Sequence, residues 1–143
     1  MNEIRHQVGI AASVDEVHKA LVTARGISGW WTHCSGDFEV GGTIVFDFII
    51  MQMPMRIIEM GESRIVWQVL EGDEQWRDTE IVFELEPRKD QVMVNFRHQG
   101  WRELTELFDH CSTKWAVFML SLKDYVETGS GQPVPDDTQI NHY

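Results

Sequence analysis

Hydrophobic residues recur along this chain with two periods, which separate a central β region from helical ends. Residues 4–10 alternate apolar and polar side chains, as a half-buried strand does. Alternation returns between Gly36 and His98, where turn residues interrupt it. Strands are predicted at residues 37–40, 43–50, 55–60, 64–70, 77–86 and 91–98. Because Gly41–Gly42 and Gly61–Glu62 suit short hairpin turns, we expect an antiparallel meander.

Two short helices are predicted after the first strand. Ser13 is placed to cap the first of them, and Glu16 three residues later completes a capping box. An apolar stripe follows and ends before Gly26. A short second helix or turn then carries Trp30 and Trp31.

The strongest helical signal lies at the C-terminal end. Apolar residues at alternating spacings of three and four predict one helix over residues 104–127, which Gly129 ends. The stripe contains Leu104, Phe108, Cys111, Trp115, Phe118, Leu122 and Tyr125, widened by Met119 and Val126. A coiled coil has similar spacing, but the strands need a cover, so packing on the sheet is favoured. The expected fold is α+β, with a single domain over residues 1–129 and a mobile tail over residues 130–143.

Composition narrows the classes of partner. The chain has 143 residues, the usual size of one domain, and a net charge of −11 with only 12 lysines and arginines. This charge argues against nucleic acid and against an anionic membrane as partners. No apolar run is long enough to span a bilayer, and residues 1–10 lack a signal-peptide core. We therefore expect a cytoplasmic protein in which Cys34 and Cys111 are free thiols.

A family resemblance rests on the order strand, two short helices, six strands and long helix. It is carried by residues 12–21, 30–31, 36–42, 79–85, 98–101 and 120–129. With these residues the chain resembles the helix-grip superfamily of START domains, birch-pollen-allergen-like proteins and polyketide cyclases. Within it, the chain is most similar to homologues of the heat-shock-protein ATPase activator. The resemblance covers residues 3–129 and implies a curved antiparallel sheet of six to seven strands wrapped around the long helix.

The resemblance also implies a cavity between the helix and the concave face of the sheet. Strand alternation and helix periodicity predict which side chains face this space. The predicted lining residues are Trp30, Trp31, Phe46, Phe48, Arg56, Trp67, Phe83, Phe96, His98, Trp115 and Met119. Arg56 enters this set because a two-residue turn at Gly61–Glu62 pairs it with Trp67. A solid aromatic core is the competing interpretation of the same residues.

Three functions fit these features. The first is binding of a small apolar or amphipathic molecule in the cavity. The second is a chaperone-associated role, linked to the stress response, that acts through the surface. The third is a cyclase or hydrolase that uses His98 as acid and base. Superfamily membership does not choose among them, because one scaffold hosts all three.

No catalytic residue, cofactor or metal is predicted. His33–Cys34 and His110–Cys111 are adjacent pairs that lack the spacing of common zinc motifs. The oligomeric state is open between monomer and homodimer. A homodimer has a basis in the apolar residues predicted on the outward face of the sheet, Val45, Ile49, Val82 and Met93.

Overall fold

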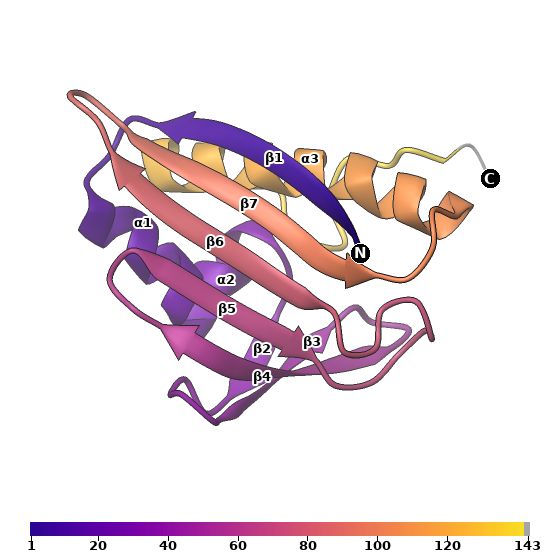
Figure 1. Ribbon diagram of the computed structural model, residues 1–143. Helices are drawn as coiled ribbons and strands as arrows, with labels where there is room; N and C mark the ends of the chain where they lie inside the picture. Colours follow the sequence, from indigo (N-terminus) through magenta and orange to yellow (C-terminus); the bar gives the residue numbers. More distant parts are fainter. Residues whose placement is uncertain (142–143) are drawn as a thin grey trace.

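The computed structural model describes residues 1–141, whose core is a seven-stranded antiparallel sheet covered on one face by helices (Figure 1). In chain order the elements are β1 (Asn2–Ile10), α1 (Val14–Val22), α2 (Ala24–Trp30), β2 (Cys34–Gly36), β3 (Thr43–Asp47), β4 (Gln52–Met60), β5 (Arg64–Val69), β6 (Glu80–Pro87), β7 (Val92–Trp101) and α3 (Glu106–Thr128). None of these helices is long and apolar enough to cross a membrane.

The strand order is β1-β7-β6-β5-β4-β3-β2. Strands β2 to β7 therefore form a meander, and β1 pairs with β7 at the far edge. Helix α3 lies behind β1 and β7 in Figure 1, with α1 and α2 on the same side of the sheet. This arrangement confirms the predicted α+β helix-grip fold.

Local capping explains where the helices begin and end. Ser13 Oγ accepts a hydrogen bond from the backbone N–H of Glu16 at 3.2 Å, as the capping box predicts. Thr105 caps α3 by accepting from Phe108 N, so the helix begins at Glu106 and not at the predicted residue 104. Leu104 consequently lies outside the helix and is 68% exposed. Gly129 ends α3 with a φ of 87°, a left-handed conformation that glycine adopts without strain.

The first hairpin differs from its prediction at both ends. The strand expected at residues 37–40 is instead Cys34–Gly36, which pairs with β3. Strand β3 ends at Asp47, three residues before the predicted end. The Oδ1 atom of Asp47 accepts from the N–H of Ile49 at 2.8 Å, and Ile49 has a φ of 74°. This local turn takes the chain out of the extended conformation.

The predicted register of β4 against β5 is wrong by one residue at Arg56. A β-bulge between Ile57 and Glu59 inserts an extra residue, so Ile57 and not Arg56 is opposite Trp67. Arg56 is exposed and pairs with Gln68. Because side chains alternate between faces, this single insertion moves Arg56 out of the predicted lining.

Close packing between α1 and α2 leads to a testable stability prediction. A Cβ atom on Gly26 would lie 2.4 Å from the carbonyl oxygen of Lys19 and 2.7 Å from the Cα of Ala20. Both contacts are with backbone atoms of α1, so the added Cβ atom can be accommodated only if α1 and α2 move apart. Gly26→Ala should therefore lower the free energy of unfolding by about 1–3 kcal/mol, measured by urea denaturation.

The matched control is Gly61→Ala. A Cβ atom there meets no atom closer than 3.4 Å, the carbonyl oxygen of Arg64. Its stability should stay within about 0.5 kcal/mol of the parent protein. Equal effects of the two alanines would contradict the packing explanation.

Candidate ligand-binding cavity

The cavity lies at one end of the domain, between the first half of α3 and the loops beyond the sheet. Its volume is about 780 Å³. The walls come from the turn after β3, the loop between β5 and β6, helix α3 and the C-terminal segment. The lining includes the aromatic side chains of Trp31, Phe48, Trp76, Trp115 and Phe118, together with the large aliphatic side chains of Ile49, Ile50, Met51, Met53 and Leu107.

The structure separates the predicted lining residues into two groups. Trp31, Phe48 and Trp115 do line the cavity. The remaining predicted apolar residues are fully buried in the core and are absent from its lining: Trp30, Phe46, Trp67, Phe83, Phe96 and Met119.

The aromatic rings of this buried group form a continuous series of contacts. The ring of Trp67 lies 5.0 Å from that of Phe83, and Phe83 lies 5.4 Å from Phe96. Trp31 stacks on Trp67 with centroids 5.9 Å apart and an interplanar angle of 3°. The solid aromatic core is therefore the correct interpretation for most of the set. Trp31 and Trp115 stand at the boundary between this core and the cavity.

His98 is completely buried and its hydrogen bonds define its protonation state. The indole Nε1 of Trp115 can only donate, and it donates to His98 Nδ1 at 3.0 Å. The Nδ1 atom is therefore unprotonated, and the ring proton of neutral His98 lies on Nε2. Nε2 is 2.8 Å from the hydroxyl of Thr79, which itself donates to the Trp76 carbonyl at 2.6 Å.

This environment argues against His98 as a catalytic acid and base. Burial lowers the pKa of His98 to about 3, far below the range in which a proton shuttle works near neutral pH. Both ring nitrogens are engaged, and the residue does not line the cavity. The enzyme alternative built on His98 thus has no structural support.

The cysteines are equally poor nucleophiles. Cys34 and Cys111 are free and buried. Burial raises the pKa of each thiol to about 11, so the reactive thiolate is scarce at neutral pH. Cys111, which lines the cavity, acts there as a small apolar side chain.

Charged groups in the cavity gather around Lys114. Its ammonium forms an ion pair with Asp137 and donates to the carbonyl oxygen of Thr138 at 2.9 Å. The same ammonium lies 5.2 Å from the centre of the Phe118 ring, within the range of a cation–π contact. Asp73 and His110 are the other ionisable polar residues of the lining.

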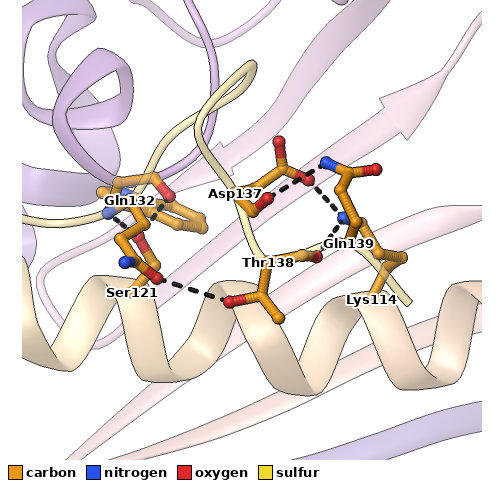
Figure 2. Close-up of polar contacts among 7 residues, drawn as sticks. Lys114, Ser121, Gln132, Asp137, Thr138 and Gln139 are labelled. Carbon is orange, nitrogen blue, oxygen red and sulfur yellow. Dashed lines mark hydrogen bonds and ion pairs between the residues drawn. The ribbon is translucent and has the colours of Figure 1, made fainter. Parts of the chain in front are cut away.

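The C-terminal segment forms one wall because it turns back along α3 (Figure 2). The hydroxyl of Ser121 donates to the Trp30 carbonyl and accepts from the N–H of Gln132, both at 2.8 Å. The N–H of Val134 donates to the Trp31 carbonyl at 2.8 Å. These bonds attach the C-terminal segment to the domain, whereas the sequence predicts a mobile tail. Its last residues, 142–143, lie outside the described part.

The predicted lining lacked most of the residues contributed by the first half of α3, by the loops and by the C-terminal segment. Leu107, Cys111, Lys114 and Phe118 are spaced by three or four residues, so helix periodicity alone could have placed them on one face of α3. No such periodicity could have placed Asp137 in the lining, because it lies outside any helix or strand. Its position depends on contacts between segments far apart in the sequence.

An antiparallel sheet covered by one long helix, with an apolar cavity at their junction, defines a helix-grip domain. Residues 11–127 match the family described as Activator of Hsp90 ATPase homolog 1-like protein, and the chain belongs to this family. A search of curated protein sequences returns no significant match.

Solved structures agree with this assignment. The solution structure of the Aha1 dimer from Colwellia psychrerythraea is 40% identical, with a TM-score of 0.84, over 92% of this chain and 100% of that chain. CalU16 from Micromonospora echinospora is 19% identical, with a TM-score of 0.78, over 99% and 75%. DynU16, from the dynemicin biosynthetic locus, is 19% identical, with a TM-score of 0.80, over 92% and 49%. The last two support the fold alone.

Proposed function

We propose that this protein binds a small apolar or amphipathic molecule in the cavity beside α3. The observation that carries the proposal is an apolar space of about 780 Å³, within the size range of small-molecule sites. Aromatic rings from α2's end, the β5–β6 loop and α3 supply flat walls, through Trp31, Trp76 and Trp115. The resemblance to the helix-grip superfamily, one scaffold that hosts ligand carriers among other functions, is consistent with this use.

Filling the cavity tests the proposal. Leu107 is half-buried in the lining, and Leu107→Trp would place a bulky ring in the space. We expect at least roughly tenfold weaker binding of the neutral fluorescent probe Nile red, since the ring displaces ligand contacts. Titration of the probe emission measures this change.

Leu104→Trp is the matched control. Leu104 is 68% exposed just before α3 and does not line the cavity, so this variant should bind Nile red as the parent protein does. Equal binding by the parent, Leu107→Trp and Leu104→Trp proteins would place the probe elsewhere. No binding by the parent protein would contradict the proposed function.

A chaperone-associated role is the second candidate. It is favoured by the exposed apolar loop at the mouth of the cavity, where Ile49 is 63% and Ile50 is 92% exposed. The family description, which refers to an activator of an Hsp90 ATPase, is consistent with it. Ile50→Asp should then abolish any stimulation of such an ATPase, measured as the rate of phosphate release with and without the variant.

The proposal also covers the oligomeric state of the protein and its location in the cell. The 40% identical relative is described as a dimer, so we propose a homodimer in preference to a monomer for this chain. Sedimentation equilibrium distinguishes the two. A cytoplasmic location stays a prediction, consistent with two free thiols.

A further inference from the structure

We infer that the cavity takes ligands bearing a carboxylate, whose oxygens replace those of Asp137 at the Lys114 ammonium. The inference rests on the proposed function and adds a chemical class to it: an apolar body with an acidic head. Asp137 would then act as a built-in competitor that the ligand displaces.

Lys114 is the first reason. It is the one lysine or arginine in the cavity lining of the described chain, so an anionic head has a single permanent cation to approach. Its side chain is only 18% exposed and that of Asp137 only 6%. The ammonium also lies over the ring of Phe118, which belongs to the apolar wall. Charge and apolar surface are therefore adjacent in one site.

The electrostatic requirement of Lys114 is the second reason. A largely buried ammonium is costly without an anionic partner, and Asp137 satisfies that need when the cavity is free of ligand. A ligand carboxylate satisfies it equally well, because it offers the same acceptor atoms and the same charge. The exchange leaves the charge beside Lys114 unchanged, while the released Asp137 carboxylate regains water.

The attachment of the tail is the third reason. The N–H of Gln132 donates to the Ser121 hydroxyl, and the N–H of Val134 donates to the Trp31 carbonyl. Neither bond involves Lys114. Only the segment beyond Val134 must shift to free the ammonium, and residues 135–139 belong to no helix or strand. Figure 2 shows Gln132 at Ser121 and Asp137 at Lys114, at different positions along α3, with one long hydrogen bond between them, from the Thr138 hydroxyl to Gln132 Oε1 at 3.4 Å. Local opening of such a segment costs little compared with global unfolding.

The remaining charges orient the ligand. Asp73 also lines the cavity, and its carboxylate repels an acidic head placed beside it. The acidic head therefore belongs at Lys114, and the apolar body belongs against the wall that includes Trp31 and Trp115.

The test compares decanoic acid with 1-decanol, which share the alkyl chain and differ in the charged head. Isothermal titration at pH 7.5 yields the ratio of the decanol Kd to the decanoate Kd for each protein. Asp137→Asn removes the competing charge with little change of shape, so this ratio should rise roughly tenfold. In the double variant Lys114→Gln with Asp137→Asn, which leaves no buried charge unpaired, the ratio should fall below that of the parent.

Lys123→Gln is the matched control. Lys123 also lies on α3, but it pairs with Glu127 and does not line the cavity. Its ratio should equal that of the parent protein. In addition, saturating decanoate should shift the backbone amide resonance of Thr138, whose carbonyl contacts Lys114, far more than saturating decanol does.

The outcomes separate the two proposals. If both ligands bind but the ratio is the same in the parent, Asp137→Asn and double-variant proteins, the carboxylate inference is overturned and the apolar cavity stands. If neither ligand binds to any of them, the proposed function is overturned, and the inference is overturned with it.

Discussion

Trp115→Ala is expected to lower the free energy of unfolding by about 3–5 kcal/mol, the largest single effect predicted for this protein. The indole is 3% exposed and lies 4.5 Å from the Phe96 ring and 4.9 Å from the Trp31 ring, measured between centroids. Alanine removes these contacts and also leaves His98 Nδ1 without its donor inside the core. Chemical denaturation with two spectroscopic probes measures the loss.

Trp115→Phe is the control that separates packing from hydrogen bonding. Phenylalanine retains an aromatic ring against Trp31 and Phe96 but cannot donate to His98. We expect a loss of about 1–3 kcal/mol, the cost of an unsatisfied buried acceptor. A loss from Trp115→Ala no larger than that from Trp115→Phe would mean that the indole contributes little packing. Trp115 would then be a wall of the cavity alone.

Acidification is expected to destabilise the protein steeply because of His98. Burial holds the pKa of His98 near 3 in the folded state, against 6.5 for an unperturbed histidine. Below pH 6.5 the unfolded chain therefore binds a proton that the folded protein does not. The stability contributed by neutral His98 is fully present above pH 6.5 and is lost as the pH falls toward 3. The expected slope is about 1.4 kcal/mol per pH unit.

His98→Asn isolates this contribution from that of the carboxylates. The hydrogen-bonded Glu127, whose pKa is lowered chiefly by the Ala11 N–H, also loses its stabilising effect in acid. Asparagine cannot titrate, so unfolding free energies between pH 6 and pH 4 should decline more gently in the variant. The difference in slope should be about 1.4 kcal/mol per pH unit. Parallel slopes would show that His98 is protonated in the folded protein.

Most of the fold could be predicted because its signals are local. The capping box at Ser13, the alternation of the strands and the stripe of α3 each reflect the geometry of one element. The fold class and the antiparallel order follow from short hairpin turns and from the need to cover one face of the sheet. The errors occur where a local interaction ends or shifts a strand, as the Asp47 turn and the bulge at Ile57 do.

The site was less predictable, since it depends on how elements meet. Burial of Phe46, Trp67, Phe83 and Phe96 follows from alternation, but alternation does not tell whether rings fill a space or surround it. That depends on the shapes of facing side chains, which only the packed structure determines. Here they fill the middle of the domain and leave the space at one end, beside Trp31 and Trp115.

The sequence by itself determined most of the residues that form the sheet, the covering helix and the apolar core, because periodicity and capping act over a few neighbouring residues. Only the tertiary structure decided the site. It brought Asp137 to Lys114, moved Arg56 to the surface and enclosed His98 between Thr79 and Trp115. Each of these outcomes depends on contacts across long stretches of chain or on one inserted residue, for which hydrophobic patterning carries no signal.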